Sequence, residues 1–266
     1  MIHPLFDLSG RVAVISGAGR GLGRSMAIAF AEFGADVLLT AKTADGVQAT
    51  AEYIRGLGRR AIATTYDITE IEQIQELFTL LDREYGRIDI LANVFGPGHQ
   101  GRPEDIPVDV VDRVLHGLVT ARFYCCQEAG RRMLASGKGS IINIGSIASL
   151  SGVGRGNFAY TLGMSAVAQM TRELSVEWAG RGVRVNAILP AQVINPGLQE
   201  RMDTDPNLEA TFLRGIPIGR LGVPDDIKGV AVLLASDASS WITGALIPLD
   251  GGNLAMNAGA TPGPRK

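Results

Sequence analysis

Short apolar segments alternate with helical patterns along almost the whole chain. The predicted strands are continuously apolar, which is typical of strands covered by helices on both faces. Regular alternation of such strands with helices predicts an α/β fold, a doubly wound parallel sheet in a three-layer α/β/α arrangement. The predicted strands are Val12–Ser16, Asp36–Thr40, Ala61–Thr65, Ile88–Ala92, Ser140–Gly145, Val183–Leu189 and Ala245–Leu249.

The length of 266 residues fits one such domain, which we assign to residues 1–256. Residues 192–220 interrupt the alternation with prolines and glycines around a helical centre, which is typical of a lid or substrate loop. Residues 257–266 are rich in Gly, Pro and Ala and predict a flexible tail. The predicted helices are Leu22–Phe33, Ala44–Leu57, Glu70–Tyr85, Val108–Ala135, Asn157–Ala179 and Asp225–Ser236.

Composition excludes several classes of partner. A net charge of −2 gives no basic surface for nucleic acid. No apolar run is long enough to span a bilayer, and residues 1–10 lack the pattern of a secretory signal. The two cysteines, Cys125 and Cys126, are sequence neighbours and indicate no disulfide framework, so we expect a reducing compartment, the cytoplasm. A small-molecule substrate is the expected partner, and no metal site is predicted.

The first predicted strand runs into a glycine-rich turn that opens a helix. Glycines let backbone amides approach a phosphate closely, and the helix N-terminus adds unpaired N–H groups and a positive dipole end. In this strand–turn–helix context the pattern predicts a dinucleotide site, with a purely structural turn as the alternative. The candidate residues are Ser16, Gly17, Gly19, Arg20, Gly21, Leu22 and Gly23.

The end of the second predicted strand favours NADP(H) over NAD(H). A carboxylate there would accept hydrogen bonds from the ribose hydroxyls and select NAD. This chain has Lys42 and Thr43 instead, and Arg20 adds a second cation from the glycine-rich turn. Cations and hydroxyls suit a 2′-phosphate. The alternative is that Lys42 and Arg20 are ordinary solvated charges.

Several segments spread along the chain resemble the motifs of short-chain dehydrogenases/reductases. The similarity covers nearly the whole sequence and implies a Rossmann-type fold. It also implies hydride transfer between a nicotinamide and a carbonyl or alcohol substrate. The matching segments are Ser16–Gly23, Asp89–Gly96, Ile142–Ser146, Arg184–Pro190, Pro217–Asp226 and Ile242–Gly252.

The resemblance implies further cofactor contacts and an assembly. Asp67 and Ile68 match the pair that contacts adenine in the family. Members of the family usually assemble through two long helices and the last strand, which correspond here to residues 108–135, 157–179 and 245–249. The resemblance therefore implies a homotetramer or homodimer. The remaining cofactor residues implied by the resemblance are Asn93, Gly96, Tyr160, Pro190, Val193 and Asn195.

The catalytic residues match the family only in part. Ser146 and Tyr160 stand at the positions of the serine and tyrosine that polarise and protonate the substrate oxygen. Met164 replaces the lysine that lowers the tyrosine pKa and binds the nicotinamide ribose, and Leu118 replaces the asparagine that holds a water beside this lysine. Without a nearby cation the pKa of Tyr160 is expected at about 10 or higher. Such a tyrosine donates a proton in carbonyl reduction but is a poor base for alcohol oxidation.

These replacements leave two other functions open, a non-redox lyase or epimerase and a catalytically silent nucleotide-binding protein. Retention of Ser146 and Tyr160 favours the oxidoreductase. No lysine is expected to reach Tyr160. Other cationic side chains are candidates to compensate for the lost lysine, and His99 in particular could take a chemical role because a histidine changes protonation near pH 7. The favoured interpretation of all four is that they are surface residues of loops or helix flanks, and they are His99, His116, Arg122 and Arg155.

Overall fold

The computed structural model describes residues 2–256 and residue 260. Within them, seven parallel strands form one sheet in the order β3-β2-β1-β4-β5-β6-β7. This confirms the predicted doubly wound parallel sheet in a single domain. The strands are β1 (Val12–Ser16), β2 (Asp36–Thr40), β3 (Ala61–Thr64), β4 (Ile90–Asn93), β5 (Gly139–Ile144), β6 (Val183–Pro190) and β7 (Leu246–Leu249).

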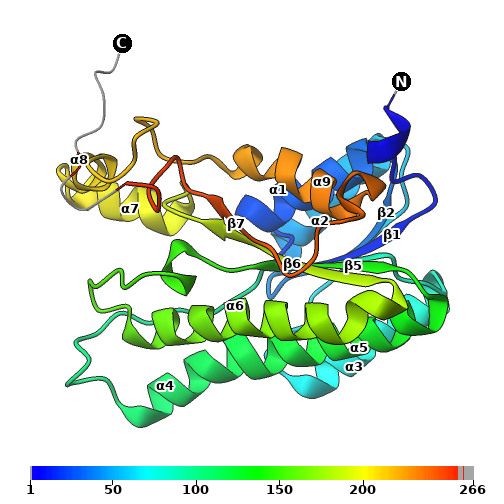
Figure 1. Ribbon diagram of the computed structural model, residues 1–266, viewed down its shortest axis with the longest axis horizontal. Helices are drawn as coiled ribbons and strands as arrows, with labels where there is room; N and C mark the ends of the chain where they lie inside the picture. Colours follow the sequence, from blue (N-terminus) through cyan, green and yellow to red (C-terminus); the bar gives the residue numbers. More distant parts are fainter. Residues whose placement is uncertain (1, 257–259, 261–266) are drawn as a thin grey trace.

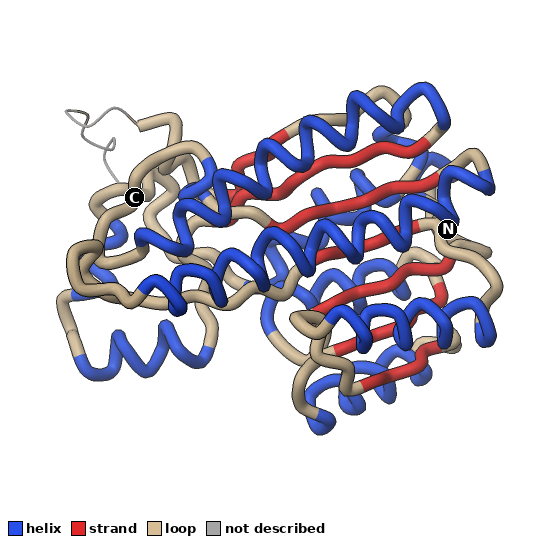
Figure 2. Tube along the Cα trace, turned by 90° about the horizontal axis from the view of Figure 1, so that it is seen from below, coloured by secondary structure: helices blue, strands red, loops and turns tan. Residues whose placement is uncertain are grey.

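Helices cover both faces of the sheet (Figure 1). One face carries α1 (Gly21–Glu32), α2 (Ala44–Gly56) and α9 (Lys228–Ala235). The view from below in Figure 2 shows the strands behind the helices of the opposite face. These helices are α3 (Ile71–Glu84), α4 (Val108–Leu115), α5 (Ala121–Ser136) and α6 (Phe158–Trp178).

Two hydrophobic clusters, one on each face, explain the continuously apolar strands. In β1, Ala13 and Ile15 belong to a cluster with Phe30 of α1. The alternate residue Val14 belongs to the other cluster with Phe78 of α3. Successive side chains of a strand point to opposite faces, so a strand covered on both sides needs apolar residues at every position.

The predicted helix over 108–135 is interrupted by a π-helical turn at His116–Thr120, between α4 and α5. A π-turn inserts an extra residue, so the faces of α5 are rotated relative to those of a continuous α-helix. The predicted helix at 225–236 also begins differently, as a 3-10 turn at Pro224–Ile227 before α9. The other predicted elements differ from the observed ones only at their ends.

The chain reverses direction across the sheet between β1 and β4, which creates a crevice at the carboxyl ends of the strands. The predicted lid region contains α7 (Pro196–Thr204) and α8 (Leu208–Leu213), which lie beyond this edge (Figure 1). Apart from residue 260, the predicted tail at 257–266 lies outside the described residues. None of the helices in the described part of the chain is long and apolar enough to cross a membrane. The lid residues pack in a cluster of their own, centred on Leu198, Phe212, Ile216 and Leu221.

Candidate active site

The glycine-rich turn has the close backbone packing that a phosphate cradle requires. Gly17 has a φ of +68°, a left-handed conformation that side chains disfavour. A Cβ on Gly23 would lie 2.2 Å from the Gly17 carbonyl oxygen, so only glycine fits there. Helix α1 begins at Gly21 and directs its first N–H groups toward the carboxyl edge of the sheet. This geometry fits a dinucleotide pyrophosphate.

Ser16, the first residue of the predicted motif, lies inside the protein. It is 2% exposed, and its hydroxyl accepts hydrogen bonds from Val94 N–H at 3.1 Å and from Phe95 N–H at 3.4 Å. Its side chain therefore joins the end of β1 to the segment that follows β4. Any contribution of Ser16 to cofactor binding passes through the backbone of this turn.

The residues predicted to bind adenine and the 2′-phosphate lie together. Lys42 Nζ is 2.8 Å from a carboxylate oxygen of Asp67 and 5.6 Å from the centroid of the Phe95 ring. Thr69 donates two hydrogen bonds to Asp67, from its N–H at 3.0 Å and its hydroxyl at 2.7 Å. Burial raises the pKa of Asp67, but the Lys42 and Thr69 hydrogen bonds outweigh it and lower the pKa overall. Ile68 is buried beside this ion pair, and Thr43 precedes α2.

A cleft of about 800 Å³ opens at the carboxyl edge of the sheet. Its volume suits a nucleotide end together with a small substrate. It brings together most residues predicted for the nicotinamide end, namely Leu22, Gly96, Ser146, Tyr160, Met164, Pro190, Val193 and Asn195.

Two predicted cofactor residues use their side chains within the protein. Asn93 is 2% exposed and donates to Asn143 Oδ1 at 3.0 Å and to Cys126 Sγ at 3.2 Å. Asn195 caps α7, since its Oδ1 accepts from Leu198 N–H at 3.1 Å. Both residues therefore shape the site, whatever contact they make with a cofactor.

Ser149, which is not among the predicted site residues, links the segment of Ser146 to the helix of Tyr160. Ser146 begins a 3-10 turn, Ile147–Ser149, and its N–H donates to Ser149 Oγ at 3.3 Å. Ser149 Oγ donates in turn to the Met164 carbonyl at 2.8 Å, on the helix that carries Tyr160. The available signal was a polar residue three positions after Ser146, which is the spacing of a capping box.

The environment of Tyr160 keeps its phenol protonated. Burial raises the pKa of Tyr160 above its ordinary value, and this effect is only partly offset by a hydrogen bond with Ser146 and by the charge of Arg122. A neutral phenol beside the Ser146 hydroxyl is equipped to donate a proton to a substrate oxygen.

The replaced positions form a packed apolar cluster. Leu118 is fully buried and Met164 is 3% exposed, and both belong to one cluster with Ala159. A Cβ on Gly163 would lie 2.6 Å from Leu118 Cδ1, and a Cβ on Gly96 would lie 2.5 Å from Leu118 Cδ2. The leucine therefore occupies the space beside both glycines.

The described lysines lie away from Tyr160 and pair with carboxylates. Lys42 pairs with Asp67, Lys138 lies 3.0 Å from Asp237, and Lys228 lies 3.4 Å from Asp225. Lys266 lies outside the described residues.

Three other cationic candidates are exposed, as expected for surface residues. His99 lines a separate surface pocket beside α4, while its neighbours Gly98 and Gln100 line the cleft. His116 Nε2 lies 2.8 Å from the Thr69 carbonyl. The Arg155 guanidinium lies 4.7 Å from the Phe212 ring centroid and lines the cleft.

The interpretation of Arg122 as a surface residue is wrong. Arg122 is only 2% exposed. Its guanidinium donates to the carbonyls of Asn93 at 3.1 Å, Ile144 at 2.6 Å and Phe95 at 2.5 Å. The π-turn at His116–Thr120 rotates the faces of α5, so the side of the helix that carries Arg122 could not be predicted from the residue pattern.

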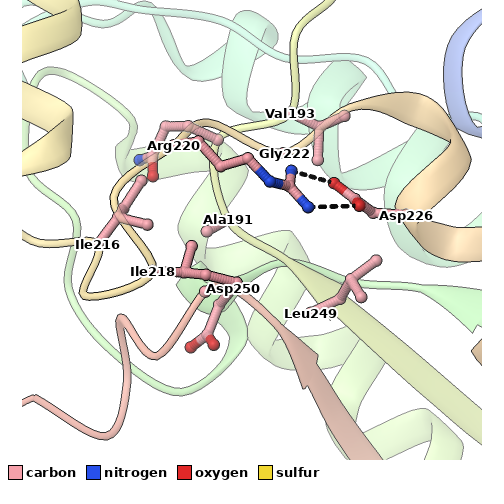
Figure 3. A pocket seen from close by; sticks show the side chains of 11 residues that line it. Ala191, Val193, Ile216, Ile218, Arg220, Gly222, Asp226, Leu249 and Asp250 are labelled. Atoms are coloured by element: carbon pink, nitrogen blue, oxygen red, sulfur yellow. Dashed lines mark hydrogen bonds and ion pairs between the residues drawn. The ribbon is translucent and has the colours of Figure 1, made fainter. Parts of the chain in front are cut away.

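A second pocket, of about 180 Å³, lies at the base of the lid and shares Ala191 and Val193 with the main cleft (Figure 3). Arg220 forms two hydrogen bonds with Asp226, at 2.7 and 2.8 Å. Asp226 also accepts from Val223 N–H at 2.8 Å. The hydrogen bond from Arg220 lowers the pKa of Asp226, so the pair stays ionised and fixes the lid base.

Comparison with known proteins is consistent with this geometry. A family model described as Enoyl-(Acyl carrier protein) reductase matches residues 17–253. A 2-dehydro-3-deoxy-D-gluconate 5-dehydrogenase of Bacillus subtilis (strain 168) is 38% identical over 94% of this chain and 97% of its own. The chain belongs to the short-chain dehydrogenase/reductase family. Its relatives are named as dehydrogenases, and the protein is accordingly assigned as an oxidoreductase.

Solved structures of the family share the fold. A short-chain type dehydrogenase/reductase from Mycobacterium marinum superposes with a TM-score of 0.86 at 32% identity, over 95% of this chain and 98% of that one. A gluconate 5-dehydrogenase from Burkholderia cenocepacia J2315, in complex with NADP and tartrate, gives a TM-score of 0.89 at 28% identity, over 96% and 99%. The protein is thus a member of a family that binds NAD(P).

Proposed function

We propose that the protein is an NADP(H)-dependent oxidoreductase that favours carbonyl reduction, with Ser146 and Tyr160 as its catalytic residues. The observation that carries this proposal is the pairing of Ser146 with a neutral Tyr160 in the wall of a cleft that also contains Leu22 of the glycine-rich turn. Met164 and Leu118, which replace the family's lysine and asparagine, pack against each other and leave this pair in place.

The proton in this reaction comes from Tyr160. Bound NADPH supplies the hydride to the substrate carbon. Ser146 donates a hydrogen bond to the substrate oxygen and polarises the carbonyl, while the Tyr160 hydroxyl gives its proton to the same oxygen. The reverse reaction requires a phenolate, which the raised pKa of Tyr160 disfavours. Reduction is therefore the preferred direction.

The preference for NADP(H) rests on Lys42, with Thr43 next to it in the sequence and Arg20 in the glycine-rich turn. The Lys42 ammonium is half-exposed beside Asp67, where it is accessible to a phosphate. Fluorescence titration with NADPH and NADH tests this proposal. Lys42→Ala should weaken NADPH binding tenfold or more, because a charge-assisted hydrogen bond contributes about 1.5–3 kcal/mol, and should leave NADH binding unchanged. Failure of the wild type to bind NADPH at millimolar concentration would refute the redox proposal.

We also propose that the substrate carries a carboxylate and several hydroxyl groups. Two arginines, Arg155 and Arg201, line the cleft, and its described lining contains no aspartate or glutamate. Arginine recognises carboxylates through its planar set of donors. Relatives named for gluconate and 2-dehydro-3-deoxy-D-gluconate, both sugar acids, support this class. The remaining polar side chains suit hydroxyl groups, and they are Gln100, Asn157, Gln192 and Asn195.

Paired substrates test this class. Rates with NADPH should be higher for a keto-aldonate than for the neutral ketose of the same chain length. Arg155→Gln and Arg201→Gln should each raise the KM for the acid about tenfold, as expected when one charge-assisted contact is lost, and leave that for the ketose unchanged. An equal change in both KM values would contradict a carboxylate contact.

We further propose that the chain forms a homodimer or homotetramer, as the family resemblance implies. Large apolar side chains are exposed on the helices expected at the interfaces, including Phe123 of α5 and Phe158, Leu162 and Val176 of α6. Patches of this kind favour association.

A further inference from the structure

Arg122 places a buried positive charge directly behind the wall of the cleft. Its three hydrogen bonds go to carbonyls at the carboxyl ends of two neighbouring strands, Asn93 and Phe95 of the β4 end and Ile144 of the β5 end. These strand ends continue into Gly96 and the Gly145–Ser146 segment, which line the cleft. The guanidinium is therefore fixed relative to the catalytic residues.

The surroundings of Gly96 show how close Arg122 lies to Met164, which stands at the position of the family's lysine. A Cβ placed on Gly96 would lie 3.4 Å from Arg122 Nη2 and 3.7 Å from Met164 Cε. Gly96, Met164 and Tyr160 all line the cleft. The guanidinium and the Met164 side chain, which stands where the family has an ammonium, therefore both lie next to Gly96.

The charge of Arg122 has no counter-ion among the described residues. Its acceptors are neutral carbonyls, and its Nε has no hydrogen-bond partner there. The acidic groups that feel its charge are Cys126, Tyr160 and Cys125. Burial raises the pKa of Cys126 to about 12 and raises that of Cys125 as well, so both thiols stay neutral. A buried charge without a counter-ion is costly, so it favours formation of an anion nearby.

Tyr160 is the acidic neighbour of Arg122 that borders the cleft and exchanges a proton in the proposed reaction. Ser146, at the start of the 3-10 turn, forms a hydrogen bond with the phenol, and the charge of Arg122 on α5 acts on it. Arg155 and Arg201, both exposed, are the other charged groups of the cleft.

We propose that Arg122 is the cation that stabilises the Tyr160 phenolate during turnover, in place of the ammonium that the family carries at position 164. The inference rests on the proposed function. When the substrate oxygen takes the phenolic proton, the O–H bonding electrons stay on Tyr160, and the guanidinium offsets the resulting negative charge. Arginine keeps its own protons, so the phenolate regains a proton from solvent through the open cleft rather than from a side-chain relay.

Two variants test this role through the pH profile of alcohol oxidation with NADP+. Arg122→Met removes the charge, whereas Arg122→Lys retains it. The Met variant should move the midpoint of the oxidation profile up by about one unit or more, which lowers oxidation at neutral pH about tenfold. The Lys variant should keep the midpoint near that of the wild type. A Met variant that is active with an unshifted midpoint overturns the proposal and leaves Arg122 as a structural clamp.

If Arg122→Met does not fold, the charge-exchange variant Arg122→Met/Met164→Lys replaces it. Our proposal predicts a midpoint close to that of the wild type, because one cation takes over from another. A midpoint lower by about one unit or more would show that Arg122 had contributed nothing, since the new ammonium would then be the first cation to act on the phenol.

Phenolate absorbance gives the same information without turnover. The difference between each protein and its Tyr160→Phe partner reports the titration of Tyr160 alone. A wild type without redox activity refutes the proposed function, whereas an unshifted Tyr160 titration in the Arg122→Met variant refutes only the role of Arg122.

Discussion

The chemistry of this site depends on how individual residues shift the pKa of the Tyr160 phenol. Ser146 offers a hydrogen bond, Arg122 offers a buried charge, and burial opposes both, so the pKa of Tyr160 is still raised overall. Met164, at the position of the family's lysine, contributes packing instead of charge. The site therefore retains the proposed proton donor, Tyr160, and lacks the lysine that exchanges protons with it in the family.

The raised pKa of Tyr160 predicts opposite pH dependences for the two directions. Reduction needs the protonated phenol, which a raised pKa preserves beyond the ordinary titration range of tyrosine, so its rate should stay level through neutral pH. Oxidation needs the phenolate and should rise about tenfold per pH unit over the same range. Initial rates in both directions between about pH 6 and pH 10 measure this, with Tyr160→Phe as the inactive control. A plateau of oxidation below pH 8 would be inconsistent with a raised pKa.

At the scale of elements, the active site depends on the contact of α6 with the π-turn and with the 3-10 turn after β5. Gly163 of α6 lies against Leu118 of the π-turn, and Ser149 links the 3-10 turn to the Met164 carbonyl. Both contacts fix the position of Tyr160 along α6 relative to Ser146. The two links are local and can be broken one at a time.

Gly163→Ala should destabilise the protein, although alanine is the better helix former. The helix propensity gain is about 0.5–1 kcal/mol, but the new Cβ would lie 2.6 Å from Leu118 Cδ1, and such overpacking costs about 1–3 kcal/mol. Chemical denaturation measures the difference. Gly229→Ala in α9 is the matched control, because a Cβ there meets no atom within 4 Å, and it should be neutral or stabilising. In a Leu118→Ala background the Gly163→Ala penalty should disappear; an equal penalty in both backgrounds would exclude the Leu118 contact as its cause.

Ser149→Ala should lower both stability and kcat. The hydroxyl accepts from Ser146 N–H and donates to the Met164 carbonyl, and its removal leaves buried groups unpaired at about 1–3 kcal/mol. Ser151→Ala is the control from the same segment, since the Ser151 hydroxyl donates to the Ile147 carbonyl of its own turn, whereas that of Ser149 donates to α6. If both variants lose kcat equally, Ser149 has no special role in alignment.

For the whole molecule, the strand order decides where the site lies. Reversal of the chain between β1 and β4 opens the crevice at the carboxyl edge, and the lid helices α7 and α8 lie beyond it. Apolar side chains are exposed elsewhere on the surface. Val176 of α6 is 80% exposed and Trp241, close to β7 in the sequence, is 97% exposed.

These two residues test the proposed assembly. Val176→Asp and Trp241→Asp place a charge in two separate apolar surfaces, where burial of an unpaired carboxylate is unfavourable. If the protein is a tetramer built through both surfaces, each variant should dissociate to dimers and the double variant to monomers of 28.1 kDa. Light scattering after size exclusion gives the mass. A wild type that elutes as a monomer would disprove the assembly.

The residue pattern by itself determined the sheet and the glycine-rich turn, whereas the pair Ser146 and Tyr160 was predicted through the resemblance to the family's motifs. These signals are local, because continuous apolar runs mark covered strands and glycines mark a close backbone approach. The sequence also predicted the loss of the family's cation at Met164. The sequence did not predict the ion pair between Lys42 and Asp67 or the hydrogen bond from Ser149 to the Met164 carbonyl, because each joins two segments that are separated in the sequence.

Only the tertiary structure decided the position of Arg122. Its residue type predicts exposure, because a charged side chain is rarely buried without a partner. Three carbonyls at the ends of β4 and β5 satisfy its guanidinium in the interior, and those strand ends meet only when the sheet has formed. The π-turn at His116–Thr120 sets which face of α5 points at them. A charge that the residue order places on a helix flank is thereby brought into the interior, where it acts on the phenol of Tyr160.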